Sequence, residues 1–323
     1  MSTPGAVCSV PVVLGVVSNA VKVVTRAGRI IKDIMNTGNL GIVDKGGNDL
    51  QTEADRSVQR CIVSSLSRQF PKLTIIGEET LEDKAIDEDW IISDRDKDVL
   101  AVSLPELLKG VKEEDIVVWV DPLDGTHEYT QGFLDHVTIL VGIAVGGKAV
   151  GGVIHQPYYN YQVEKDVLKQ GRTMWGIVGV GAFGGKAVPP PENKRIVTVT
   201  RSHSNDMVSR CLDAMQPDEV LRAGGAGHKV LLLIEGKAHA YVFPSSGCKK
   251  WDTCAPEAIL CATGGLLTDI HGNQYDYHKD VEHPNSRGLL ATSIASQRSW
   301  YLSRVPRDIL DHFKPSSCTK SSK

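Results

Sequence analysis

The chain has 323 residues, 41% hydrophobic and 23% charged, a composition that excludes a mainly disordered protein and allows two packed subdomains or one large α/β domain. Its 36 basic and 39 acidic residues give a net charge of −3, which excludes a general positive field that would gather nucleic acid. The seven cysteines form no Cys-x-x-Cys pair, which argues against a disulfide framework or a zinc site. We therefore expect a cytoplasmic protein that has neither a nucleic-acid nor a membrane partner.

The beginning of the chain predicts two helices followed by a strand. Apolar residues recur at three- and four-residue steps from Val13 to Ile34, which indicates a core helix rather than a membrane anchor. A second helix is predicted from Gln51 to Phe70, with Asp55 in its opening turn. A short strand from Leu73 to Ile76 follows, and it ends at the pair Glu78-Glu79.

The middle of the chain predicts further strands of the same sheet. The strongly acidic segment from Glu78 to Asp115 is interpreted as a solvated, mobile excursion. The continuous apolar run from Ile116 to Val120 predicts a strand that is covered on both faces and ends abruptly at Asp121. Residues 137–145 and 149–156 predict a hairpin, and residues 175–185 continue the sheet or form its edge.

The run Pro189-Pro190-Pro191 is the clearest linker and divides the chain into predicted subdomains 1–188 and 189–323. Strands and helices alternate after it, which predicts a layered α/β arrangement. The predicted strands are 196–200, 219–222, 238–243 and, as the last one, 266–269; the predicted helices are 205–215, 227–236 and 253–263.

The hexapeptide Asp121-Pro122-Leu123-Asp124-Gly125-Thr126 carries the strongest chemical signal. Two carboxylates on a turn constrained by proline and glycine can converge on one hard cation, although the same residues also form ordinary turns. Further acidic residues are predicted at the ends of elements, where they can share a cleft: Asp55, Glu78, Glu79 and Asp252. Oxygen donors of this kind favour Mg²⁺, with Mn²⁺ as a substitute, and predict a two-metal hydrolase of phosphate esters.

Several blocks resemble the lithium-sensitive, magnesium-dependent phosphatase superfamily of inositol monophosphatase and fructose-1,6-bisphosphatase: Gly77-Glu78-Glu79, Trp119 to Thr126, and Trp251 to Pro256. The blocks Lys72 to Glu79, Arg201 to Asn205 and Gly247 to Asp252 are similar to those of its nucleotide-hydrolysing members. The resemblance implies a five-layered αβαβα sandwich with the site between the two subdomains. Most metal ligands would then lie in the first subdomain, and the last ligand and the nucleotide-binding residues in the second.

The resemblance also implies how the metal ions are held. One Mg²⁺ would be bound by Glu78, Asp121 and the carbonyl of Leu123, and a second by Asp121, Asp124 and Asp252. A third, weaker ion would lie near Glu78 and Glu79.

Two further sets of residues receive roles from the same resemblance. Asp55 and Thr126 would polarise the attacking water, the hydroxyl relaying a proton to the carboxylate. The residues that would hold the nucleotide include a glycine-rich turn entering a helix, which is typical of anion sites: Thr200, His203, Gly225 and Lys229.

The activity that the resemblance implies is attack of a metal-activated water on the 3'-phosphate of adenosine 3',5'-bisphosphate, which yields AMP and phosphate. The sulfated form, 3'-phosphoadenylyl sulfate, would lose its 3'-phosphate in the same way, and Li⁺ would inhibit. We expect a monomer with a small-molecule nucleotide as its partner. Inositol monophosphate or inositol 1,4-bisphosphate is an alternative substrate, and a catalytically silent nucleotide sensor is a remote alternative.

Some residues beside the predicted site are interpreted as structural. Trp119 and Trp251 are expected to pack, Cys254 and Cys261 to fill the core, and the adjacent lysines 249 and 250 to form a solvated pair, with phosphate contact as the alternative. Three histidines without partnered spacing are also assigned structural or surface roles: His155, His239 and His271. The chain departs from the superfamily pattern at His127, where lysine is usual, and at His228, where a neutral amide is common.

Overall fold

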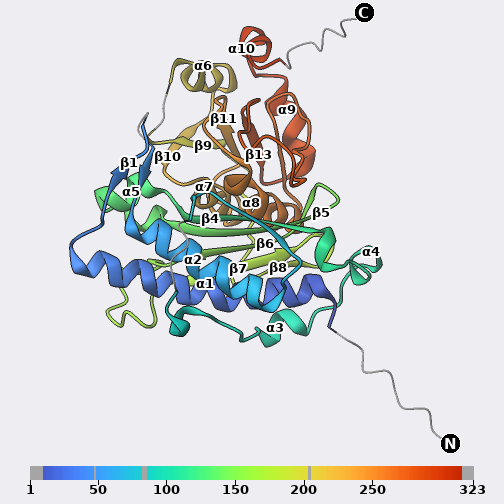
Figure 1. Cartoon of the computed structure of the whole chain (residues 1–323). Coiled ribbons are helices and arrows are strands. Elements are labelled where there is room, and N and C mark those ends of the chain that lie inside the picture. The colour runs from blue at the N-terminus through green and yellow to red at the C-terminus, as the bar shows by residue number, and fades with distance from the viewer. Residues whose placement is uncertain (1–9, 47–48, 82–85, 203–204, 315–323) are drawn as a thin grey trace, which may run out of the picture.

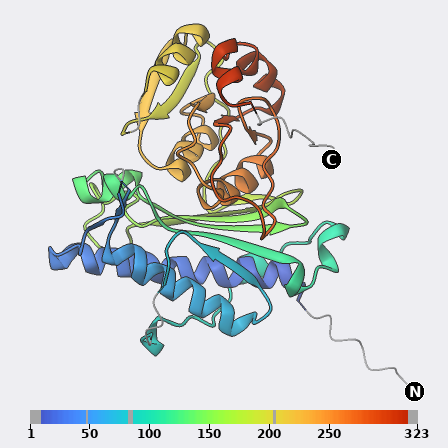
Figure 2. The same ribbon diagram turned by 45° about the horizontal axis from the view of Figure 1, so that its top comes forward.

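The computed structural model describes residues 10–46, 49–81, 86–202 and 205–314. Its secondary structure is stacked in five layers, as Figures 1 and 2 show: two helices, a six-stranded sheet, two helices, a five-stranded sheet and a final layer of helices. The predicted αβαβα sandwich is therefore confirmed. None of the helices in the described ranges is long and apolar enough to cross a membrane.

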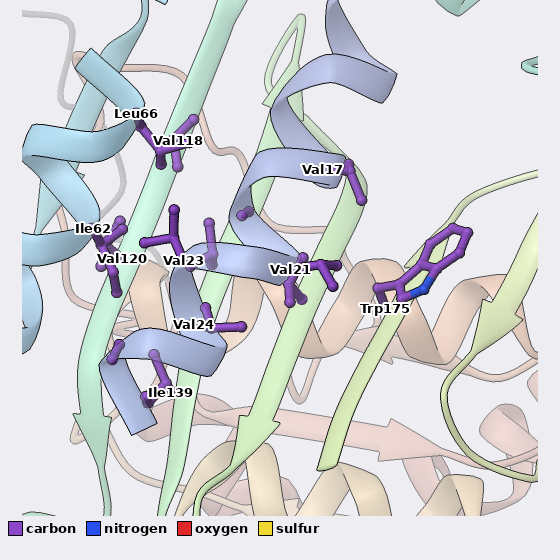
Figure 3. Close-up of a cluster of buried hydrophobic side chains, with 14 of the residues drawn as sticks. Val17, Val21, Val23, Val24, Ile62, Leu66, Val118, Val120, Ile139 and Trp175 are labelled. Carbon is purple, nitrogen blue, oxygen red and sulfur yellow. The ribbon is translucent and has the colours of Figure 1, made fainter. Parts of the chain in front are cut away.

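The first layer consists of α1 (Val12–Thr37) and α2 (Glu53–Gln69). Gly38, at φ +73°, ends α1 in the left-handed conformation that glycine adopts without strain. Both helices place their apolar faces on the six-stranded sheet, where each buried aliphatic side chain contributes about 1.5–3 kcal/mol. Figure 3 shows this core: Val17, Val21, Val23, Val24, Ile62, Leu66, Val118, Val120, Ile139 and Trp175.

The six-stranded sheet has the order β3-β4-β5-β6-β7-β8, and only β3 and β4 pair in parallel. The predicted hairpin of β5 and β6 is confirmed. The strands are β3 (Thr74–Gly77), β4 (Ile116–Asp124), β5 (Thr138–Val145), β6 (Lys148–Gln156), β7 (Arg172–Ile177) and β8 (Gly181–Phe183).

The middle layer consists of α7 (Ala226–Ile234) and α8 (Lys250–Ala262), which follow the predicted linker but pack on the first sheet. Glycines in the strands make this close approach possible. A Cβ at Gly142 would lie 2.5 Å from Cβ of Cys254, and one at Gly152 would lie 2.5 Å from the carbonyl oxygen of Ala255. The start of α8 is thereby held against the sheet that carries the hexapeptide.

The five-stranded sheet has the order β10-β9-β11-β13-β12. Its strands are β9 (Ile196–Thr200), β10 (Glu219–Ala223), β11 (Ala240–Phe243), β12 (Leu266–Thr268) and β13 (Leu289–Thr292). The outer layer comprises α6 (Asp206–Met215), α9 (Arg298–Leu302) and α10 (Arg307–His312). The predicted boundary after residue 188 falls between the two sheets, and the division into two subdomains stays a prediction.

Short elements connect these layers. They are β1 (Val43–Asp44), β2 (Leu50–Gln51), α3 (Lys97–Leu100), α4 (Glu106–Lys109), α5 (Thr126–Gln131), and the 3₁₀ turns Glu88–Trp90, Glu113–Asp115, Leu134–His136 and Ala295–Gln297. Strands β1 and β2 form a small antiparallel ribbon near the hexapeptide.

Two expectations from the sequence were wrong. Residues 266–269 are not the last strand, because β13 comes later and inserts between β11 and β12. Helix α8 begins at Lys250, three residues before the predicted start at Thr253. Most acidic side chains in the described part of the segment 78–115 are exposed, as predicted, although the buried Val99 and Leu104 anchor the segment to the core and Asn19 of α1 donates to two of its carbonyls.

Candidate active site

A cleft of about 330 Å³ collects residues from both halves of the chain. Its lining includes most of the residues predicted to act: Glu78, Asp124, Thr126, Thr200, Gly225, Lys229 and Asp252. Asp55, Glu79, Asp121 and Leu123 do not line the cleft, and all four are buried. The predicted nucleotide-binding residue His203 lies outside the described residues.

The hexapeptide is not the free turn that the sequence predicted, because β4 continues through it to Asp124. Asp121 still pairs with Leu140 of β5, and the register then shifts before Asp124 pairs with Thr138. The backbone N–H of Leu123 donates to Oδ1 of Asp121 at 3.0 Å. This irregular strand end fixes both carboxylates on the rigid sheet, where a loop would leave them mobile.

Asp121, Asp124 and Asp252 form a compact acidic cluster. Each offers one carboxylate oxygen, and these oxygens lie within 4.8 Å of one another. Burial raises the pKa of Asp121 well above its usual value, with additional effects of Glu78 and the other two aspartates. Burial and the charge of Asp124 raise the pKa of Asp252 to about 6. A divalent cation would relieve this repulsion, and a set of hard oxygen donors suits Mg²⁺.

Asp124 is oriented by the start of α7. The backbone N–H groups of Ala226 and Gly227 donate to its two oxygens at 2.7 and 2.8 Å, and the hydroxyl of Thr138 donates at 2.6 Å. Gly225 precedes these donors at φ +69°, and a Cβ there would lie 2.9 Å from Oδ2 of Asp124. Glycine is thus required at position 225 for the backbone at the start of α7 to approach the carboxylate of Asp124 at the end of β4.

Asp252 lies in the first turn of α8, where it accepts the backbone N–H of Lys249 at 2.6 Å. The fully buried Asn285 holds this turn in place and was missed by the sequence analysis. Its amide nitrogen donates to the carbonyl of Lys249 at 2.9 Å and to the hydroxyl of Thr253 at 3.0 Å. Its amide oxygen accepts from Nζ of Lys250 at 2.6 Å.

The interpretation of Lys249 and Lys250 as a solvated pair was wrong. Lys250 is buried against Asn285, and burial lowers its pKa to about 8. Lys249 lies in the cleft, where its ammonium is 3.6 Å from Asp49 and 3.8 Å from Glu78. Two adjacent lysines thus have different roles, because the helix start turns their side chains to different neighbours.

Glu78 and Glu79 at the end of β3 are neutralised by lysines. Lys45 of the β1–β2 ribbon lies 3.0 Å from Glu79 and 3.8 Å from Glu78. Glu79 also accepts a hydrogen bond from the amide of Gln51. Burial and the charge of Asp252 raise the pKa of Glu78 to about 8. The carboxylate of Glu78 therefore lies close enough to the aspartates to interact with them, but among the described residues it is not part of the 4.8 Å cluster.

Asp55 and Thr126 meet behind the cleft, although they are far apart in the sequence. The hydroxyl of Thr126 lies 3.2 Å from Oδ1 of Asp55 and 3.0 Å from the carbonyl oxygen of Leu123, so its one proton can be given to either acceptor. Thr52 caps α2 and donates its N–H and its hydroxyl to Oδ2 of Asp55, both at 2.6 Å. Burial raises the pKa of Asp55 to about 6, although these bonds oppose the rise.

Lys229 of α7 is buried and lies over the ring of Tyr241 at 5.0 Å. Its ammonium donates to the carbonyl of Gly225 at 2.6 Å, and it therefore stabilises the glycine turn from inside while lining the cleft. Burial lowers the pKa of this lysine. Tyr241, Phe243 and Cys248 form an apolar part of the lining that the sequence gave no signal to find.

The interpretation of both tryptophans as packing residues is confirmed. Trp119 and Trp251 are buried with their rings 6.4 Å apart, and the indole N–H of Trp119 donates to the carbonyl of Tyr277. Cys254 is fully buried in the same cluster, as predicted.

An aspartate cluster beside a carboxylate–threonine pair, between the two sheets, defines the class as an α/β protein with an acidic site that could hold a cation. The sequence model of the inositol monophosphatase family matches residues 15–302. The chain therefore belongs to the inositol monophosphatase family, and the predicted resemblance is confirmed.

Curated relatives are similar over nearly the whole chain. The chain is 54% identical to the 3'(2'),5'-bisphosphate nucleotidase 1 of Homo sapiens over 305 residues, which cover 94% of this chain and 98% of the human protein. It is 33% identical to inositol monophosphatase 3 of Xenopus laevis, over 85% of this chain and 76% of that protein.

Solved structures agree on the fold. An IMPase of Thermotoga maritima superposes with a TM-score of 0.64 at 19% identity, over 91% of this chain and 97% of that one. The extragenic suppressor protein suhB of Bartonella henselae superposes with a TM-score of 0.65 at 20% identity, over 89% and 96%.

Proposed function

We propose that the protein hydrolyses the 3'-phosphate of adenosine 3',5'-bisphosphate to AMP and phosphate, and that of 3'-phosphoadenylyl sulfate in the same way. The observation that carries the proposal is the meeting, around one cleft, of the aspartate cluster, the Asp55–Thr126 pair and the lysine-bearing start of α7. The 54% identity to a bisphosphate nucleotidase supports the nucleotide as substrate.

The residues that would hold Mg²⁺ are Glu78, Asp121, the Leu123 carbonyl, Asp124 and Asp252, with Glu79 near a third ion. The cluster fits the metal, since two buried carboxylates and the half-buried one of Asp252 offer oxygen donors within 4.8 Å of one another. When bound, Mg²⁺ supplies the positive charge that lowers the pKa of water and stabilises the phosphate oxygens. Li⁺ would inhibit as an ion of similar size and half the charge.

Proton transfer is assigned to Asp55 and Thr126. The threonine hydroxyl can take a proton from the attacking water as it gives its own proton to Oδ1 of Asp55, 3.2 Å away. With a pKa of about 6, Asp55 is largely ionised at neutral pH and remains a stronger base than a solvated aspartate. Because water is the nucleophile, the proposed reaction forms no covalent intermediate between the enzyme and the phosphate.

The cleft also offers groups that suit a nucleotide phosphate. Lys229 brings a positive charge, and Thr200, the last residue of β9, lines the same cleft. The apolar patch of Tyr241 and Phe243 can take the less polar part of the substrate.

Phosphate release from adenosine 3',5'-bisphosphate, inositol 1-phosphate and fructose 1,6-bisphosphate, measured in parallel with Mg²⁺, with EDTA and with Mg²⁺ plus Li⁺, tests the proposal. We expect strong preference for the nucleotide, loss of activity in EDTA and inhibition at millimolar Li⁺. Preference for inositol phosphate would retain the metal chemistry and refute the assigned substrate. Tight nucleotide binding without phosphate release would instead support a sensor.

A further inference from the structure

A second cavity, of about 240 Å³, lies on the other side of α7 from the proposed active site. His228, Leu231, Leu232 and Glu235 line it, and their spacing places them on one face of the helix. Ala226 and Lys229 line the active-site cleft instead. One helix thus separates two cavities that share no lining residue.

The opposite wall of the second cavity is aromatic. It is formed by the connection between β6 and β7, with the rings of Tyr158, Tyr159 and Tyr161 and the guanidinium of Arg172. The guanidinium lies over the ring of Tyr159, with 4.2 Å between Cζ and the ring centroid. Tyr158 and Tyr161 meet edge to face at 6.0 Å. Aromatic faces grouped in this way are suited to stack a flat ring.

The charged groups of the cavity neutralise one another. Arg172 donates to Gln156 at 2.7 Å and pairs with Glu235, and Lys237 pairs with the other oxygen of Glu235 at 2.6 Å. Asp135 balances the remaining positive charge of the lining. The cavity therefore lacks the net positive charge that a phosphate group needs, and it favours an uncharged ligand.

Two polar atoms of the lining residues have no hydrogen-bond partner within the described ranges. They are the hydroxyl of Tyr158, a side chain that is 6% exposed, and Nδ1 of His228. A buried polar atom without a partner costs about 1–3 kcal/mol and calls for an explanation. Both residues line this cavity, so a small side-chain rotation would bring either atom to a bound ligand.

We propose that this cavity is a second binding site, for an uncharged planar aromatic compound of the purine nucleoside class. The ring would stack against the tyrosines, and its polar edge would meet the polar groups of the lining. The site is independent of the proposed catalytic function, because its lining residues are separate from those of the cleft.

Adenosine, which carries no phosphate, is the probe for the test. We would titrate it calorimetrically into the full chain and into two variants, Tyr159→Ala in the cavity wall and Leu168→Ala, an exposed apolar residue of the same connection that does not line the cavity. We expect adenosine to bind, Tyr159→Ala to weaken binding by at least about fivefold, and Leu168→Ala to leave it unchanged. Both side chains are exposed, so both variants are expected to fold, which their melting temperatures would verify.

Cross-linking with 8-azidoadenosine would locate the bound nucleoside. Label on residues 157–172 or 231–237, assigned by fragmentation of the labelled peptides, supports the proposal. Absence of adenosine binding, equal binding in both variants, or label confined to peptides of the active-site cleft such as 241–252 would overturn it. Phosphate release by Tyr159→Ala reports separately on the catalytic proposal, since that variant should keep its activity.

Discussion

Glu78 and Glu79 face two lysines, whereas Asp121, Asp124 and Asp252 face one another. The glutamates are paired within the chain, and the side chain of Glu79 is only 2% exposed beside Lys45. Asp121 and Asp124 are also buried and Asp252 is half-buried, but the partners of these aspartates are backbone N–H groups, a hydroxyl and further carboxylates. Glu79 therefore has a cationic partner within the chain, whereas the aspartates repel one another, which fits the proposal that they hold an external cation together with Glu78.

The largest expected effect comes from breaking the aspartate cluster. Asp121→Asn should lower the rate of phosphate release by more than about a hundredfold, because it removes a charged oxygen donor at the centre of the cluster. The fold should survive, because burial and the neighbouring carboxylates raise the pKa of Asp121. The site therefore disfavours a charged side chain at this position and should accept the uncharged amide of asparagine. Phosphate release and calorimetric Mg²⁺ binding would measure the effect.

Asp96→Asn serves as its control, because Asp96 pairs with Lys22 far from the cleft. Wild-type turnover in Asp121→Asn would refute the metal assignment.

Asn285→Ala should give the next largest effect. It removes three side-chain hydrogen bonds around the helix start that carries Asp252 and leaves the buried ammonium of Lys250 without that partner. We expect a loss of about 2 kcal/mol in the free energy of unfolding and about tenfold weaker Mg²⁺ binding. Denaturant unfolding and calorimetry would measure both quantities. The exposed Asn193→Ala is the matched control, and unchanged Mg²⁺ binding by a folded Asn285→Ala would contradict the positioning role.

Lys45→Met tests the pairing of Glu78 and Glu79 with a lysine. Loss of the ammonium leaves Glu79 with less compensation, so we expect the protein to lose about 1 kcal/mol of stability. The same change removes a positive charge near Glu78, and Mg²⁺ should bind more tightly because less charge repels it. Thermal melting in EDTA and a Mg²⁺ titration would show this, with Lys148→Met as a surface control. Weaker Mg²⁺ binding would mean that Lys45 orders the site instead.

Glu257→Gln should have the smallest effect on phosphate release, and it sharpens the comparison with a buried acid outside the cluster. Burial raises the pKa of Glu257 to about 7, while the hydroxyl of Tyr277 donates to its carboxylate at 2.6 Å. The native state therefore binds more protons than the unfolded state between about pH 4.5 and pH 7, and wild-type stability falls as the pH rises through that window.

Glutamine does not titrate, so the stability of Glu257→Gln relative to the wild type should increase by roughly 2–3 kcal/mol from pH 5 to pH 8. Melting temperatures across this range would measure it, with the exposed Glu106→Gln as control. A difference that stays constant with pH would disprove the assignment. Phosphate release should change little.

Local sequence patterns determined the regular elements of the first half and the identity of the acidic residues. Three such patterns are the apolar periodicity of α1, the capping residues of α2 and the hexapeptide. Each depends on residues that are close in the sequence, so it can be recognised without knowledge of the tertiary structure. Tertiary structure decided the rest, because contacts between distant segments leave no local pattern. The insertion of β13 between β11 and β12 depends on pairing along both of its edges, which its four residues, Leu-Leu-Ala-Thr, do not encode.

The assembly of the site shows the same division. The sequence by itself supplied the carboxylates, the Thr126 hydroxyl and Lys229. Only the tertiary structure decided that Lys45 pairs with Glu79 and that Asn285 fixes the start of α8. It also decided that Lys249 lines the cleft whereas Lys250 is buried against Asn285. The physical reason is that a side chain's charge state and partners depend on burial and on neighbours brought from elsewhere in the chain, which a single sequence does not specify.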